Sequence, residues 1–237
     1  MENNMDMSMD YKVIQIDENT WRIEDHHVRF FLLTGKEKAL LIDSGMFVKS
    51  ARAIAEGLTD LPLLLLNTHA DRDHVGCNHE FESFYMHPSE AANFYNTQHM
   101  TGEFTAITEG EVIDLGERPL EIVALPGHTP GSIGVLDIRG RVLFSGDPIQ
   151  DGNIFMFGVQ REMHVYLKSL RHLDKYRDRF DLIYPSHGSF PVQPALIDQL
   201  YDAVPGIFAG KYPFEQAEFH GQQVKVYDVG IAHFLLP

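Results

Sequence analysis

The feature that most constrains this chain is an apolar run that leads directly into a cluster of imidazole and carboxylate side chains. Residues 63–66 are four consecutive leucines, a pattern typical of a buried strand. The loop that follows holds four potential metal ligands, which are His69, Asp71, Asp73 and His74. Two imidazoles and two carboxylates in one loop would repel and desolvate one another, so a divalent cation is the simplest compensation. The alternative is a solvated polar loop, which the position after an all-apolar strand disfavours.

The length and composition predict one globular domain. The chain has 237 residues, which is enough for a single domain with a large core. Hydrophobic residues make up 44% and charged residues 22%, values that exclude a disordered chain. We therefore predict one domain over residues 1–237, with residues 1–10 as a disordered N-terminus.

The charge and the distribution of apolar residues indicate the class of partner. The formal net charge of −15 repels phosphate backbones, so we expect a small-molecule substrate and no nucleic acid. The N-terminus lacks the basic start and apolar core of a signal peptide, and no apolar run is long enough to span a bilayer. These features predict a cytoplasmic protein without a membrane partner. A homodimer is left open as its assembly.

Cys77 is the only cysteine of the chain and lies just after the His/Asp loop. A single cysteine excludes an intrachain disulfide framework and fits a reducing cytoplasm. A metal-ligand role is one interpretation of its position. A small buried hydrophobe is the interpretation that the residue type favours.

Apolar segments separated by turns predict two strand-rich regions, each followed by helices, which suggests a duplicated sandwich. The predicted strands are residues 12–16, 20–23, 28–33, 39–42, 63–66, 84–86, 111–113, 120–125, 132–138, 141–145, 180–184 and 223–228. The first four are expected to form an antiparallel meander. The predicted helices are residues 47–58, 89–95, 161–176 and 194–208. Residues 96–110 are expected to be irregular.

Several predicted strands end in a residue that can bind a metal. His128 lies in a Gly- and Pro-rich turn after one strand, and Asp147 and His187 follow two others. Rigid strands would fix these side chains while the loops shape a pocket. Asp43 also closes a strand, and its spacing leaves open whether it is a turn residue or a carboxylate that orients a ligand histidine.

Together these motifs resemble the signature of the metallo-β-lactamase superfamily, in which a His-x-His-x-Asp-His loop is followed by His, Asp and His. The resemblance covers residues 11–236 and is closest to the glyoxalase-II-like metallo-hydrolase branch. It implies an α/β fold, an αββα sandwich of two mixed sheets flanked by helices, with two metal ions at one edge. It also implies two sets of metal ligands, His69, Asp71 and His128 for one ion and Asp73, His74 and His187 for the other, with Asp147 bridging them.

Asp71 departs from the family pattern because it stands where the second histidine of the motif is usual. An Asp oxygen lies the same number of bonds from Cβ as histidine Nδ1, so the geometry still permits a metal ligand. A site richer in oxygen loosens the preference for zinc. We therefore expect two divalent ions, zinc first, with iron or manganese as alternatives.

The resemblance implies a binuclear metallo-hydrolase. A bridging hydroxide would attack a small ester, thioester, lactone or phosphoester, and Asp73 would both bind a metal and orient the nucleophile. Asp147 resembles the bridging residue of the hydroxyacylglutathione-hydrolase, lactonase and phosphodiesterase branches. An alternative is a diiron redox, oxygen-binding or sensor protein of the same fold, since flavodiiron relatives carry an acidic residue at the position of Asp71. A third hypothesis is a degenerate fold that serves as an interaction module.

Overall fold

The computed structural model describes residues 11–158 and 160–237, and the segment predicted to be disordered, residues 1–10, lies outside the described residues. The chain divides into two compact units. The N-terminal unit comprises residues 1–107 and 113–119, and the C-terminal unit comprises residues 108–112 and 120–237. Among the described residues, none of the helices has both the length and the apolarity that crossing a lipid bilayer requires.

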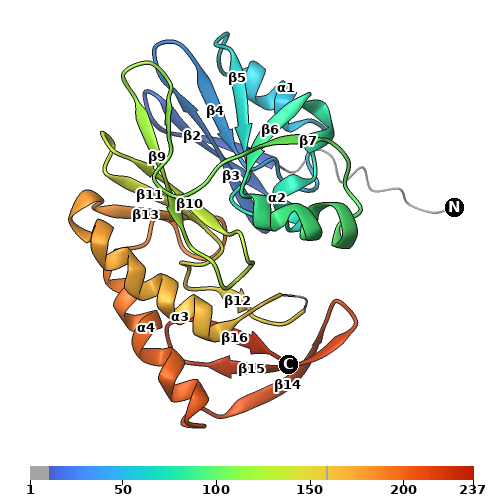
Figure 1. Cartoon of the computed structure of the whole chain (residues 1–237), viewed down its shortest axis with the longest axis vertical. Coiled ribbons are helices and arrows are strands. Elements are labelled where there is room, and N and C mark those ends of the chain that lie inside the picture. The colour runs from blue at the N-terminus through green and yellow to red at the C-terminus, as the bar shows by residue number, and fades with distance from the viewer. Residues whose placement is uncertain (1–10, 159) are drawn as a thin grey trace, which may run out of the picture. The chain divides into compact units, whose positions relative to one another are not determined.

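The N-terminal unit is built on a mixed sheet of seven strands in sequence order (Figure 1, blue to green). The first four strands pair antiparallel, as predicted, and the following pairs, from the fourth strand to the seventh, are parallel. The strands are β1 (Tyr11–Asp17), β2 (Thr20–Asp25), β3 (Val28–Thr34), β4 (Ala39–Ile42), β5 (Leu63–Leu66), β6 (Ser83–Met86) and β7 (Glu103–Ala106). Residues 96–110, expected to be irregular, therefore contain an edge strand.

Helix α1 (Ala51–Glu56) is shorter than the predicted helix over residues 47–58. The carboxylate Oδ2 of Asp25 accepts the backbone N–H groups of Met46 and Phe47, each at 2.7 Å. These hydrogen bonds hold the preceding residues in a loop, and the helix begins only after Ser50, whose side chain accepts the N–H of Ala53 as an N-cap.

Short helical turns follow β5 and β6 in the N-terminal unit. They are α2 (Arg72–Val75), the 3₁₀ turns Asn78–Glu80 and Pro88–Glu90, and the π-helical turn Asn93–Thr97. The prediction of one regular helix over residues 89–95 with Ser89 as N-cap is wrong. His87 is the residue that caps this segment, through its ring Nδ1 and the N–H of Ser89 at 3.2 Å.

The C-terminal unit holds a five-stranded mixed sheet in the order β13-β11-β10-β9-β8, and β8 begins in this unit. These strands are β8 (Val112–Asp114), β9 (Pro119–Ala124), β10 (Ile133–Asp137), β11 (Val142–Gly146) and β13 (Leu182–Pro185). Helices α3 (Met163–His172), continued by the 3₁₀ segment Leu173–Arg179, and α4 (Ala195–Phe208) share one apolar core with β9, β10 and β11. Mixed sheets with covering helices confirm the predicted α/β class.

A separate four-stranded sheet completes the C-terminal unit, in the order β12-β16-β15-β14 (Figure 1). Its strands are β12 (Asn153–Phe155), β14 (Phe214–Phe219), β15 (Gln222–Asp228) and β16 (His233–Leu236). The sequence predicted only the strand over residues 223–228. β12 has three residues and pairs in parallel with β16, which is about eighty positions away, so its own pattern is too short to indicate a strand.

Gly127 fixes the turn between β9 and β10 against helix α3. Its φ is +129°, and a Cβ atom there would lie 2.4 Å from backbone atoms of Tyr166. We predict that Gly127→Ala lowers the free energy of unfolding by at least about 2 kcal/mol, because it adds backbone strain and a clash. Gly210→Ala is the control, since Gly210 has φ +65° and a Cβ atom there would meet no atom within 4 Å. It should lose only about 1 kcal/mol in urea unfolding. Equal losses in both variants would contradict the packing role of Gly127.

Candidate metal centre

The carboxylate of Asp43 organises the ligand loop of the N-terminal unit, which is the loop over residues 67–74 that holds four of the candidate metal ligands. Asp43 follows β4 and is buried at φ +65°. Its Oδ1 accepts the backbone N–H of Thr68 at 2.7 Å, and its Oδ2 accepts the Thr68 hydroxyl at 2.8 Å. The same Oδ2 lies 2.8 Å from Nδ1 of His74. The contact confirms that Asp43 is a carboxylate that orients a histidine, whereas the role of His74 as a metal ligand stays a prediction.

These hydrogen bonds set the tautomers of two histidines. Asp43 can only accept, so Nδ1 of His74 carries a proton, and in the neutral ring the lone pair is on Nε2. The Thr68 hydroxyl donates its hydrogen to Asp43. Its oxygen therefore accepts a hydrogen bond from Nδ1 of His69 at 3.1 Å. In the neutral ring of His69 the lone pair is therefore also on Nε2, and the neutral imidazole is the form that binds a metal.

Each of these two imidazoles faces a carboxylate from the same loop. Nε2 of His69 lies 3.5 Å from Oδ2 of Asp71, and Nε2 of His74 lies 3.7 Å from Oδ2 of Asp73. The two rings have centroids 4.0 Å apart. Two ligand atoms at about 2.1 Å from a tetrahedral ion are about 3.4 Å apart. The spacing of both pairs therefore fits ligands that share an ion.

The C-terminal unit brings together the three remaining predicted ligands. Asp147 follows β11, and its Oδ2 lies 3.5 Å from Nε2 of His128 while its Oδ1 lies 3.2 Å from Nε2 of His187. Nδ1 of His128 donates to the carbonyl of Phe155 at 2.9 Å, which directs the Nε2 lone pair toward Asp147. One carboxylate with an imidazole beside each oxygen is an arrangement that can bridge two ions.

The burial of these groups explains why they fit a cation. His69, His74 and His128 are at most 1% exposed, and Asp147 is 4% exposed. A buried carboxylate is costly unless a positive charge or several donors compensate it. Within each unit, taken separately, the residues form two imidazole–carboxylate pairs, and such donor sets suit zinc, iron or manganese.

Two buried residues near Asp71 were not predicted as part of the site. Glu90 is fully buried and accepts the backbone N–H of Ala70 at 2.8 Å. Asn93 donates from Nδ2 to Oδ1 of Asp71 at 2.9 Å. The sequence gives only one indication of Glu90 and Asn93, which is that two polar residues lie three positions apart among small and aromatic residues. Asn93 lies on a π-helical turn, which has no recognisable hydrophobic period in the sequence.

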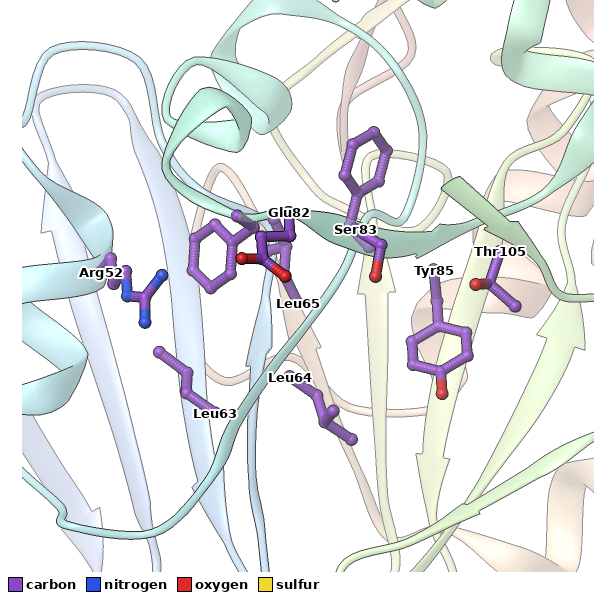
Figure 2. A pocket seen from close by; sticks show the side chains of 10 residues that line it. Arg52, Leu63, Leu64, Leu65, Glu82, Ser83, Tyr85 and Thr105 are labelled. Atoms are coloured by element: carbon purple, nitrogen blue, oxygen red, sulfur yellow. The ribbon is translucent and has the colours of Figure 1, made fainter. Parts of the chain in front are cut away.

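A surface depression of about 380 Å³ lies along β5 and β6 and has none of the candidate ligands in its wall (Figure 2). Arg52, Leu64, Tyr85 and Thr105 are among its lining residues. The Arg52 guanidinium is engaged with Glu56 at 2.7 Å and with the carbonyl of Glu80 at 3.0 Å. The depression thus offers no donor set comparable with the ligand pairs, and we do not place the chemistry there.

The sequence is similar to those of several known proteins. A family model described as the metallo-beta-lactamase superfamily matches residues 24–187. Acyl-coenzyme A thioesterase MBLAC2 of Gallus gallus is 28% identical over 201 residues, which cover 68% of this chain and 73% of that protein. Hydroxyacylglutathione hydrolase of Gloeobacter violaceus is 30% identical over 128 residues, which cover 52% of this chain and 51% of that protein.

A solved structure shows the same fold. The metallo-beta-lactamase from Pontibacter korlensis superposes with a TM-score of 0.71, over 82% of this chain and 99% of that chain. The two sequences are 17% identical, so the likeness concerns the fold alone. It agrees with the fold class that the sequence predicted.

Cys77 is placed in the apolar core, as the residue type favoured. It is 3% exposed, and its thiol donates to the carbonyl of Val48 at 3.5 Å. Burial raises the pKa of this thiol to about 11. We predict that a chromogenic disulfide reagent at pH 8 titrates no thiol in the native protein and one thiol per chain after unfolding, because the buried group is almost fully protonated. Rapid reaction of the native protein would contradict this placement.

Asp43→Asn tests the control of the histidine tautomers. The amide keeps the shape and tolerates positive φ, but it replaces an acceptor with a donor beside His74 or Thr68. We expect the affinity for Zn²⁺ to fall about 10- to 100-fold, measured by competition with a chromogenic chelator. Asp137→Asn is the matched control, because Asp137 is also buried but accepts the N–H groups of Arg139 and Gly140. Equal affinity in both variants would refute the role of Asp43.

Proposed function

The chain belongs to the metallo-beta-lactamase superfamily, and on this premise we propose that it is a hydrolase that cleaves small thioesters with the help of two divalent ions. The observation that carries the proposal is the position of Asp147 between two imidazoles, with one oxygen beside His128 and the other beside His187. A carboxylate placed in this way suits a bridging ligand in a two-metal site.

The pairs within each unit support the ligand sets that the family resemblance implies. His69 and Asp71 form one pair of the N-terminal unit, and Asp73 and His74 form the other. We propose that the first pair binds one ion and the second pair the other, and that Asp147 is shared. By the family resemblance, the complete sets would be His69, Asp71 and His128 for the first ion and Asp73, His74 and His187 for the second.

The thioester class is supported by the relatives. Both named relatives hydrolyse compounds in which an acyl group is attached to a thiol, coenzyme A in one case and glutathione in the other. The net charge of −15 repels thioesters whose thiol part carries several phosphates. We therefore propose an acyl thioester whose thiol part is small and weakly charged. The cytoplasmic location and the homodimer remain predictions.

The reaction consumes one water molecule and yields a carboxylic acid and a thiol. When bound, the two ions would supply Lewis acidity toward the carbonyl oxygen and lower the pKa of a water molecule. Asp73 has a side chain that is 32% exposed, so its carboxylate can accept a hydrogen bond from the attacking water and orient it. Thr68 and Asp43 accept from Nδ1 of His69 and His74, so the lone pair of each neutral ring is on Nε2. The carbon–sulfur bond then breaks, and the thiolate leaves without an acid catalyst because thiols are acidic.

The test of this function is hydrolysis of a short acyl thioester, measured by release of the thiol. We expect turnover by the Zn²⁺-loaded protein, its loss after treatment with a chelator, and its recovery when Zn²⁺ is restored. Asp73→Asn should reduce kcat about 100-fold or more. Asp60→Asn is the matched control, because Asp60 is an exposed aspartate of the same unit and should leave kcat unchanged.

Two results would contradict the proposal. The first is a protein that binds Zn²⁺ but hydrolyses no thioester at any metal loading. The second is hydrolysis that persists unchanged after complete removal of the metal. If the iron-loaded protein reduces oxygen and hydrolyses nothing, the diiron interpretation replaces the hydrolase.

A further inference from the structure

We propose that Asn93 is a positioning residue that holds the carboxylate of Asp71 in the orientation in which one oxygen is offered to a metal beside His69. The inference rests on the proposed function in one respect, since it takes Asp71 as a metal ligand. It goes beyond that function because it assigns a role to a residue outside the seven proposed ligands and accounts for the aspartate at this position of the motif.

The hydrogen bonds of Asn93 distinguish the two oxygens of Asp71. Nδ2 of Asn93 donates to Oδ1 of Asp71 at 2.9 Å, while Oδ2 of Asp71 lies 3.5 Å from Nε2 of His69. The orientation of the Asn93 amide is set by its other contacts. Its Oδ1 accepts from Nε2 of Gln98 at 3.2 Å, and its Nδ2 lies 3.5 Å from Oε2 of Glu90. A flipped amide would lose these contacts and would place an oxygen against two carboxylates.

The anchor of Asn93 is rigid because it is buried and tied to the ligand loop. Glu90 is fully buried, and the Oε2 that contacts Asn93 also accepts the backbone N–H of Ala70, which lies between His69 and Asp71 in the sequence. The π-helical turn is closed by the N–H of Gln98 bonded to the carbonyl of Asn93 at 2.8 Å. Such turns are rare and frequently occur at functional sites.

The chemistry of a carboxylate explains why this support matters. Asp71 has two equivalent oxygens on a short side chain, so without a donor on one side it can rotate or bind an ion through either oxygen. A neutral amide donor occupies Oδ1 and adds no charge that would repel a cation. The amide also lies between Asp71 and Glu90, and therefore separates two acidic groups.

A double-mutant cycle tests this role with Zn²⁺ as the probe. The proteins are the wild type, Asn93→Ala, Asp71→His and the double variant, and the readout is Zn²⁺ affinity by competition with a chromogenic chelator. We expect Asn93→Ala to weaken the first site about 10- to 100-fold in the wild-type background. In the Asp71→His background the same change should have less than about a threefold effect, because a histidine ring is not held through a carboxylate oxygen.

Asn96→Ala is the matched control, because Asn96 is an exposed asparagine of the same turn and should leave Zn²⁺ affinity unchanged. Asn93→Ser repeats the cycle if Asn93→Ala does not fold, since the hydroxyl remains polar beside Glu90 but is too short to reach Asp71. The proposal is overturned if removal of Asn93 leaves Zn²⁺ affinity unchanged, or lowers it by the same factor in both backgrounds. The proposed function fails separately, if Zn²⁺ binding depends on Asn93 as expected but no thioester is hydrolysed.

Discussion

The three hydrogen bonds accepted by the carboxylate of Asp43 are the interaction on which the ligand loop depends. They join the end of β4 to the segment after β5, and they engage Thr68 twice and His74 once. Because a carboxylate only accepts, its position determines which ring nitrogen of His74 carries the proton, and through Thr68 it determines the same for His69. A buried hydrogen-bond network holds its members rigidly, so Asp43 and Thr68 fix the orientation of these two histidine rings.

Buried charge gives the second constraint. Asp43 and Glu90 are compensated by donors from backbone and side chains, so neither needs a cation. Asp147 differs, since its two oxygens face imidazoles whose Nε2 atoms are directed at it. A divalent ion would compensate the buried negative charge of such a group. The hydrogen bond from Asn93 to Asp71 is a related case. The amide is neutral, so it orients the carboxylate without neutralising the negative charge that would attract a metal ion.

The ends of strands were the most predictable part of the molecule. An unbroken apolar run followed by His or Asp identifies both the strand and the side chain at its end, and this holds for His69 after β5, Asp147 after β11 and His187 after β13. Asp43 was recognisable for the same reason, although its partner was not. Hydrophobic periodicity is a local signal, and the position of a residue at the end of a strand depends only on that local pattern.

The parts that were missed depend on contacts distant in sequence or on irregular backbone. β12 forms by pairing with β16, and α1 begins late because Asp25 engages the N–H groups of Met46 and Phe47. Asn93 lies on a π-helical turn, which displaces side chains from the spacing that a regular helix predicts. The resemblance to a family did not help there, since the family motif contains a histidine where this chain has Asp71.

Anomalous diffraction from crystals of the Zn²⁺-loaded protein would test whether Asp147 bridges two metal ions. Data collected on both sides of the zinc absorption edge locate each ion independently of any assumption about its ligands. We predict two peaks about 3.5–4 Å apart, each in contact with a different oxygen of Asp147, and one of them beside Asp71. A single peak, or two peaks of which only one contacts Asp147, would contradict it.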